Sequence, residues 1–297
     1  MKTLDYKKID AFTSEGSLGN PAACIYLKND EILTELEMLD IAKQHKGFVS
    51  EVIYCKPKSE NTFELVYFSS ECEVDFCGHG TIACMYSLIK ENNELINKKE
   101  LFIITRKKGK LTVFNEINTQ NAVYITAPNP QNIGTKLQID EIANNLSIKI
   151  NKISMLHPID LIDAGLKTLI VPIINLKEEI NIFPNEQTLK SFCINNDIDI
   201  ILIFTLETAN SQNIAHTRVF APKFGYLEDP ATGSGNSAFG YYMLKNNIWD
   251  GSPVTIEQGG IDRIFNLINL SFSDNKLLFG GKATVRIEGK YYANLQG

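Results

Sequence analysis

Two short stretches decide the fold expected from this sequence: DFCGHGT at residues 75–81 and DPATGSG at residues 229–235. Each joins a strand-like segment to the start of an apolar, helix-like segment through closely spaced glycines. The chain therefore shows a weak internal repeat of a strand, a glycine-rich turn and a helix start. Two related halves would bring two helix N-termini to one cleft, where unpaired N–H groups and the helix dipole favour a carboxylate.

Strand-like and helix-like segments alternate on both sides of these turns. Period-2 alternation predicts strands, and apolar residues at helical spacing predict helices. In the first half we expect strands at 4–12, 22–27, 51–55, 62–68, 101–105, 110–115 and 122–127, and helices at 35–45 and 81–92. In the second half we expect strands at 160–163, 168–172, 199–205, 214–220, 254–258, 264–271 and 283–291, and helices at 140–145, 186–195 and 237–246. The pattern predicts an α+β protein in which strands predominate.

A Pro-Asn-Pro turn at residues 128–130 interrupts this pattern and marks the expected boundary between the halves. We expect an N-terminal domain over residues 1–128 and a C-terminal domain over 129–297, with the final strand returning to the first domain. A length of 297 residues agrees with two domains of ~150 residues each.

The composition argues against nucleic-acid and membrane partners. A net charge of −6 disfavours nucleic-acid binding, and we expect the basic run at 106–110 to be the solvated turn of a hairpin. No apolar run reaches the ~18 residues of a membrane span, and the first residues do not resemble a secretory signal. The six cysteines show no metal-ligand spacing. We therefore expect a cytoplasmic protein without a metal.

The first turn offers two candidate catalytic groups, His79 and Cys77. Glycines on both sides of the histidine allow the backbone to approach a ligand closely. At a helix start the dipole would lower the pKa of His79 and keep its ring neutral. The alternative is a tight turn with an incidental histidine. Cys77 could be a thiolate, since a helix N-terminus lowers the pKa of a thiol, or it could be a small buried hydrophobic residue.

The second turn combines the Asp229 carboxylate with the hydroxyls of Thr232 and Ser234 ahead of a helix. It could cradle a carboxylate or phosphate, or it could be an ordinary capped helix start; no Walker-type lysine follows it. In the sequence GNPAA at 19–23, Asn20 could offer its amide to a ligand or belong to a common turn. Glu51, at the start of a strand, is unremarkable by composition.

Taken together, these motifs resemble those of the PhzF-like family of phenazine-biosynthesis-like proteins. The matching pieces are DAF at 10–12, GNPAA at 19–23, SE at 50–51, EVDFCGHGT at 73–81, DAGL at 163–166, RVFAP at 218–222, EDPATGS at 228–234, EQG at 257–259, Arg263 and GGKA at 280–283. They span nearly the whole chain in the family's order. The resemblance implies a diaminopimelate epimerase-like fold of two similar domains. Each would be a mostly antiparallel sheet or open barrel around a central helix, with the active site in the interdomain cleft.

The resemblance also implies roles for particular residues. Glu51 matches the general acid/base that moves a proton between carbons of a small unsaturated or α-amino acid, and Asp229 and His79 match groups that assist. The remaining matched residues would bind the substrate or line its pocket: Asn20, Gly78, Gly80, Gly233 and Ser234. The resemblance implies no cofactor and no metal. The implied partner is a small-molecule carboxylate, and a homodimer is compatible with the family.

The sequence departs from relatives of the superfold at two points. Epimerases and proline racemases of this superfold use two cysteines; Cys77 stands at the first position, whereas the second aligns with Pro230, which has no acidic proton. A one-carboxylate isomerase is therefore favoured over an amino-acid racemase that uses Cys77. A non-catalytic small-molecule-binding protein on the same fold is the third alternative. Gly80 and Gly235 replace a common alanine, so we expect a slightly roomier pocket there.

Overall fold

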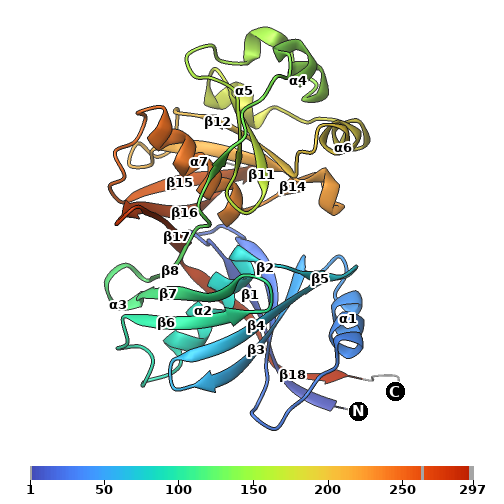
Figure 1. Ribbon diagram of the computed structural model, residues 1–297, viewed down its shortest axis with the longest axis vertical. Coiled ribbons are helices and arrows are strands. Elements are labelled where there is room, and N and C mark those ends of the chain that lie inside the picture. The colour runs from blue at the N-terminus through green and yellow to red at the C-terminus, as the bar shows by residue number, and fades with distance from the viewer. Residues whose placement is uncertain (1, 262–263, 294–297) are drawn as a thin grey trace. The chain divides into compact units, whose positions relative to one another are not determined.

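The structure is a computed structural model that describes residues 2–261 and 264–293. The chain is α+β, as predicted, and forms two compact units: Met1–Thr126 with Gly280–Gly297, and Ala127–Phe279 (Figure 1). The matched residue Arg263 lies outside the described residues. Within those residues, no helix is both long and apolar enough to cross a membrane.

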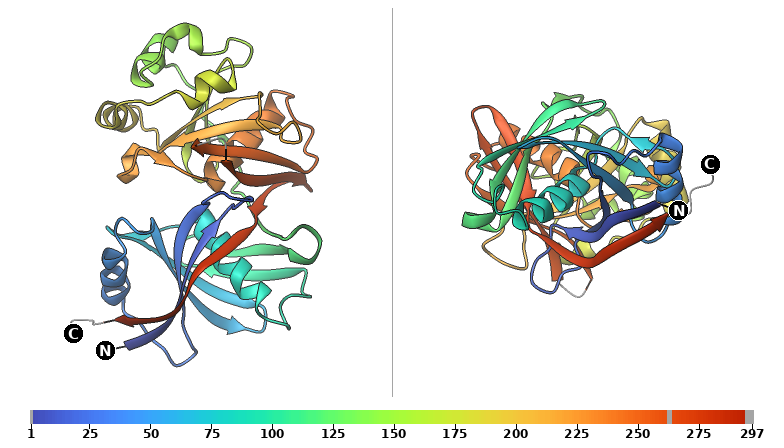
Figure 2. Two further views of the ribbon diagram at one scale, coloured as in Figure 1. Left: turned by 180° about the vertical axis from the view of Figure 1, so that it is seen from behind. Right: turned by 90° about the horizontal axis from the view of Figure 1, so that it is seen from below.

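In the first unit a sheet packs around one central helix, α2 (Gly78–Lys90). In order of pairing, its strands are β18 (Ala283–Ala293), β1 (Lys2–Ala11), β2 (Asn20–Tyr26), β3 (Glu51–Ser59), β4 (Thr62–Ser69), β6 (Glu100–Thr105), β7 (Gly109–Glu116) and β8 (Ala122–Thr126). Only β2–β3 and β4–β6 are parallel, and their connections carry α1 (Glu35–Gln44) and α2. The last strand of the chain, β18, runs beside the first, β1 (Figure 2).

Alternation along β3 determines which helix each of its side chains faces. Val52 and Tyr54 belong to the apolar cluster that includes Met38 and Ile41 of α1. Ile53 faces the opposite way, because a Cβ added to Gly80 of α2 would lie 2.6 Å from its side chain. Glu51 has the same parity as Ile53, so its side chain lies on the α2 face of the sheet.

The second unit has the same plan around α7 (Gly233–Lys245). Its strands, in order of pairing, are β9 (Gln131–Asn132), β10 (Asp160–Asp163), β11 (Lys167–Pro172), β12 (Ile200–Thr205), β13 (Ala215–Phe220), β15 (Val254–Ile261), β16 (Ile264–Ser273) and β17 (Lys276–Gly281). Its other helices are α4 (Ile139–Asn145), η1 (Ile150–Lys152), α5 (Leu176–Ile180), α6 (Glu186–Asn195) and η2 (Pro222–Phe224). Every residue of β12 is buried, because α6 covers one face and α7 packs against the other.

The internal repeat predicted from the sequence is present, but its alignment is shifted by one residue. In both units a two-residue strand precedes the central helix: β5 (Glu73–Val74) pairs with β4, and β14 (Glu228–Asp229) pairs with β13. Cys77 is the N-cap of α2, and Thr232 is the N-cap of α7. The counterpart of Cys77 is therefore Thr232. Alignment of the two stretches from Asp75 and Asp229 would pair Cys77 with Ala231, one residue earlier, and the alignment with Pro230 is wrong by two residues.

Both central helices begin earlier than predicted. The sequence pattern placed their starts at residues 81 and 237, whereas α2 begins at Gly78 and α7 at Gly233. Glycine has a low intrinsic helix propensity, so the first turn of each helix carried no helical signal. Short elements were missed as well: α3 (Ile117–Gln120), α5 and β17.

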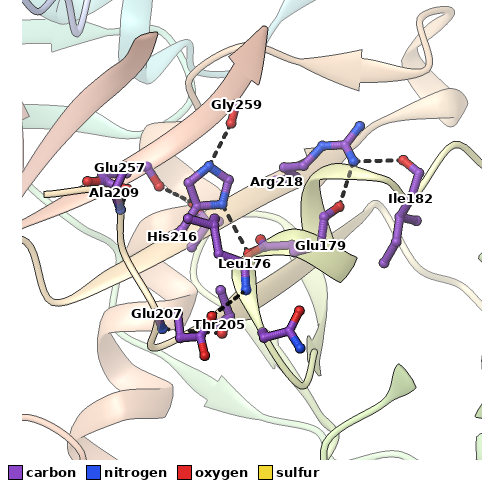
Figure 3. Close-up of polar contacts among 12 residues, drawn as sticks. Leu176, Glu179, Ile182, Thr205, Glu207, Ala209, His216, Arg218, Glu257 and Gly259 are labelled. Carbon is purple, nitrogen blue, oxygen red and sulfur yellow. Dashed lines mark hydrogen bonds and ion pairs between the residues drawn. The ribbon is translucent and has the colours of Figure 1, made fainter. Parts of the chain in front are cut away.

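A buried ionic network fixes α5 against the sheet of the second unit (Figure 3). Nδ1 of His216 lies 3.0 Å from Oε2 of Glu179, and both side chains are fully buried. The contact is an ion pair when His216 is protonated and Glu179 is ionised. His216 Nε2 donates to the Gly259 carbonyl at 2.7 Å. Arg218 donates to the carbonyls of Glu179 and Ile182 at 2.8 and 2.7 Å.

Burial raises the pKa of Glu179 to about 7, although His216 and Arg218 oppose the shift. Burial lowers the pKa of His216, but the Glu179 carboxylate raises it more, so the net pKa lies above its usual value. A group whose pKa is higher in the folded than in the unfolded protein binds its proton more tightly when the protein is folded. It therefore stabilises the fold fully at a pH below the unfolded-state pKa, and this stabilisation is lost as the pH rises through the folded-state pKa. Both groups therefore stabilise the second unit most under mildly acidic conditions.

We predict that the urea midpoint of unfolding falls between about pH 5 and pH 8, and that Glu179→Gln flattens this slope. The substitution should cost about 1–3 kcal/mol near pH 5, because it removes the partner of His216 within the core. The matched control is Glu186→Gln, an exposed glutamate of α6. An unchanged slope in Glu179→Gln would show that this pair does not carry the pH dependence.

Candidate functional site

Three reactive side chains of the first unit meet at the start of α2. Nε2 of His79 lies 3.3 Å from Oε2 of Glu51. Sγ of Cys77 lies 3.8 Å from the same carboxylate oxygen and 3.5 Å from Nδ1 of His79. The structure therefore brings together Glu51 and His79, two predicted catalytic residues, with Cys77 as their common neighbour.

The local sequence explains why these groups converge. Glu51 is the first residue of β3 and faces α2, and Cys77 is the N-cap of that helix. The sulfur accepts the Gly80 backbone N–H at 3.3 Å, so it satisfies one of the donors that every helix start leaves unpaired. His79 lies in the first helical turn, and its side chain reaches back toward Glu51 at the start of β3.

Gly80 permits the close approach between α2 and β3. A Cβ at this position would lie 2.6 Å from Ile53 and 2.9 Å from the Cys77 sulfur. The expectation of a roomier pocket at Gly80 is therefore wrong, because the Ile53 side chain fills the space. At Gly235 the nearest neighbour of an added Cβ, Ile200, would lie 3.2 Å away, so little room remains there either.

The charge state of His79 differs from the prediction. Burial lowers its pKa, but the Cys77 sulfur and the Glu51 carboxylate raise it more, and the net pKa lies well above its usual value. The predicted downward shift of the pKa was wrong in direction, because it considered the helix dipole and not the neighbouring Cys77 and Glu51. The raised pKa favours the imidazolium form of His79, which pairs with Glu51.

The pKa of the Cys77 thiol lies above its usual value, which favours the protonated form. Burial raises its pKa and Glu51 adds to the shift, whereas His79 and the Gly80 N–H oppose it without reversing it. The thiolate alternative is therefore not supported, and the side chain is buried. The cluster thus combines one carboxylate, one imidazolium and one neutral thiol.

In the second unit, Asp229 is buried at the end of β14 and accepts a short hydrogen bond from the Thr232 hydroxyl. A fully buried glutamine on β15, Gln258, holds this turn with both ends of its amide. Its Nε2 donates to the Asp229 carbonyl at 2.9 Å and to Thr232 Oγ1 at 3.0 Å. Its Oε1 accepts the Thr232 N–H at 2.8 Å and the Asn236 amide at 2.6 Å.

Gln258 was not among the predicted site residues, although it belongs to the matched EQG motif. A buried glutamine carries no periodic or spacing signal of its own. Its role follows only from the pairing of β13 with β15, which brings residue 258 beside the turn before α7. We assign it a positioning role toward Asp229.

The other predicted site residues lie in the same two turns, apart from Asn20. Gly78 and Gly80 are in the first turn of α2; Gly233 and Ser234 are in the first turn of α7. A Cβ at Gly233 would lie 2.3 Å from the Phe279 ring, so this glycine allows the start of α7 to pack closely against Phe279 of β17. Asn20 is fully buried at the first position of β2.

We predict that Gln258→Ala lowers the free energy of unfolding by about 2–4 kcal/mol, because it leaves the buried Thr232 N–H without its acceptor and removes one of the two acceptors of the Asn236 amide. Urea denaturation measures the change. Gln212→Ala, at an exposed position of the same unit, is the matched control and should change stability by less than about 0.5 kcal/mol. Equal effects of the two substitutions would contradict the positioning role of Gln258.

The chain is similar to known proteins over most of its length. A family model described as phenazine biosynthesis-like protein matches residues 9–289. The chain is 30% identical to antisense-enhancing sequence 1 of Schizosaccharomyces pombe, over 98% of this chain and 100% of that protein. It is 29% identical to the uncharacterized isomerase YfhB of Bacillus subtilis, over 87% of each.

Solved structures show the same fold. A phenazine biosynthesis protein of the PhzF family from Bacillus anthracis superposes with a TM-score of 0.84 at 28% identity, over 98% of this chain and 100% of that one. A hydroxyproline epimerase from Agrobacterium vitis superposes with a TM-score of 0.63 at 9% identity, over 98% of this chain and 91% of that one. The second likeness concerns the fold alone and confirms the epimerase-like architecture.

Proposed function

The chain belongs to the phenazine biosynthesis-like family, and from this premise we propose that it is a cofactor-independent isomerase. The reaction moves a proton between carbons of a small carboxylic or amino acid, with Glu51 as general acid/base. The observation that carries the proposal is the cluster at the start of α2, where Glu51 contacts both His79 and Cys77. Relatives that carry the name isomerase, such as YfhB, support the reaction class.

Glu51 suits a base that must take a proton from carbon and return it elsewhere. Its side chain is 15% exposed, so a substrate can reach it while most water is excluded. A carboxylate can accept the proton from one carbon, hold it as a carboxylic acid and deliver it to a second carbon. One residue therefore serves as both base and acid, and the reaction needs no second proton donor. The His79 imidazolium would orient this carboxylate through the 3.3 Å contact.

The start of α2 suits the charge that develops when a carbon next to a carboxylate loses a proton. A helix leaves its first N–H groups unpaired, and its dipole places partial positive charge there. Cys77 takes up the N–H of Gly80 through its sulfur and that of Thr81 through its carbonyl. The N–H groups of Gly78 and His79 would then serve the substrate carboxylate or enolate. Asp229 would assist substrate binding and proton transfer, and Asn20, Gly80, Gly233 and Ser234 would line the substrate pocket.

A racemase that uses two thiols is the less favoured alternative. Cys77 is a neutral thiol, and its counterpart in the second unit is Thr232, which lacks a thiol. A mechanism in which Glu51 is the base requires proton transfer by neither Cys77 nor Thr232. If the protein only binds its ligand, the Glu51 carboxylate should be dispensable for the protein's effect.

The test is solvent exchange. The protein is incubated in D₂O with a panel of small amino and unsaturated carboxylic acids, and C–H signals are followed by NMR. We expect deuterium in at least one acid with the parent and with Cys77→Ala. Glu51→Gln should exchange at least ~100-fold more slowly, because general acid/base catalysis contributes about 10²–10⁴-fold. Glu94→Gln, at an exposed glutamate, is the matched control.

Loss of exchange in Cys77→Ala with exchange retained in Glu51→Gln would move the reaction to thiol chemistry. Absence of exchange with every acid, together with ligand binding that Glu51→Gln leaves intact, would favour the binding-protein alternative. Either result would refute the carboxylate mechanism.

The exchange rate should depend on pH through His79. Because the pKa of His79 is raised, its protonated form persists through neutral pH and is lost only as the pH rises through that raised value. We expect an alkaline decline in kcat/KM for the parent that is absent in His79→Gln, whose rate should be lower and flat over the same range. An identical alkaline limb in both proteins would assign the decline to another group.

A further inference from the structure

Arg218 of β13 is a buried cation of the second unit, held in place by four hydrogen bonds. Its Nε and Nη2 donate to the two carboxylate oxygens of Glu228 at 2.9 and 2.7 Å, in a fork. Its Nη1 donates to the carbonyls of Glu179 and Ile182 at 2.8 and 2.7 Å (Figure 3). Arg218 is 4% exposed, and the centre of the Phe220 ring lies 5.1 Å from the guanidinium carbon. These contacts fix the guanidinium group from several sides.

The fork restrains the residue next to Asp229. Glu228 and Asp229 together make up β14, and so short a strand has few backbone hydrogen bonds of its own. Successive side chains of a strand point to opposite faces. Glu228 therefore points to Arg218, whereas Asp229 points to the face of α7, where it accepts the Thr232 hydroxyl. Gln258 holds this turn from the side of α7, and Arg218 holds it from the other side.

The internal repeat shows what stands at the same positions in the first unit. β5 and β14 are equivalent, so their second residues, Val74 and Asp229, are counterparts. The strand register makes Val66 the counterpart of Arg218, because each precedes the residue that pairs with Val74 or Asp229. Val66 belongs to the apolar cluster that packs against α1. The first unit therefore builds the same pair of strands with valine at both positions.

The fold thus does not require a buried cation at this position. Burial of a guanidinium and a carboxylate costs desolvation free energy, and apolar side chains in their place are often at least as stabilising. Glu73, the counterpart of Glu228, accepts one hydrogen bond of 3.2 Å from Arg106, whose side chain is 36% exposed. The buried fork stands where the neighbouring residue is the carboxylate Asp229, which points to a role in placing that carboxylate.

We propose that Arg218 is a positioning residue for the proton transfer in which Asp229 assists. It acts through Glu228 and not by contact with the substrate. The inference rests on the proposed function, because it gives a purpose to the fixed position of Asp229. Lysine cannot replace this arginine, since an ammonium group is a single point of charge and cannot form the fork while it also reaches both carbonyls.

The first test is a double-mutant cycle on the rate at which substrate exchanges with solvent. Arg218→Lys should lower kcat at least ~10-fold, because a catalytic group misplaced by about 1 Å can cost ~100-fold. In the Asp229→Asn background the same substitution should change kcat by less than about twofold, since the group to be positioned is gone. Equal losses in both backgrounds, or an unchanged kcat in Arg218→Lys, would leave Arg218 a structural role alone and overturn the proposal.

Arg106→Lys is the matched control, because Arg106 contacts the equivalent glutamate of the first unit, and it should retain the kcat of the parent. Circular dichroism checks that each variant is folded. Glu228→Gln disrupts the fork from its more exposed partner and should reproduce the loss if Arg218→Lys does not fold. A folded Glu228→Gln with the kcat of the parent would also overturn the proposal.

The second test does not depend on activity. Backbone amide hydrogen exchange, followed by mass spectrometry, reports how often the segment 226–232 opens. Arg218→Lys should speed amide exchange in this segment at least ~10-fold, because charge-assisted hydrogen bonds are lost, and Arg106→Lys should not. If the parent acts on no acid but the segment opens in Arg218→Lys, the proposed function fails and the restraint on Asp229 stands. If the parent is active and the segment does not open, the proposed function stands and the positioning role is overturned.

Discussion

A helix that is buried along most of its length is the constraint on which both units depend. In α2 and α7 the buried positions occur on all sides of the helix, as expected where a sheet wraps around it. Water cannot satisfy the N–H groups at such a helix start, so neighbouring side chains must do so. Glycines in the first turn allow the strands and side chains to approach closely enough. The same requirement concentrates polar, reactive side chains at one end of each helix.

The two units meet this requirement with different chemistry. In the first unit the Cys77 sulfur caps the helix and stands beside a carboxylate and an imidazole. In the second unit Thr232 occupies the equivalent position, but its hydroxyl is directed to Asp229 and does not cap the helix, and its own N–H donates to Gln258. The two units therefore share the strand, turn and helix start, but the side chains at the two helix starts differ. A one-carboxylate reaction needs no symmetry between the two helix starts, which is consistent with this divergence.

The sequence predicted the fold better than it predicted the site. Period-2 alternation and the paired glycine turns identified most strands and both central helices, because burial on a sheet face imposes that period. The helix starts were misplaced because glycine carries no helical signal. Glu51 was found through family resemblance and not through composition, since a glutamate at a strand start is ordinary. The charge on His79 and the role of Gln258 were out of reach, because both depend on contacts between segments far apart in the chain.

The proposed chemistry depends on the pairing of Glu51 with a protonated His79 at the start of α2. An NMR pH titration of the imidazole signals tests it directly, since the chain has only four histidines and His79→Gln assigns the resonance. We predict a pKa for His79 above the ordinary value of about 6.5 that falls toward it in Glu51→Gln. A pKa below that value in the parent, unchanged by Glu51→Gln, would contradict the account.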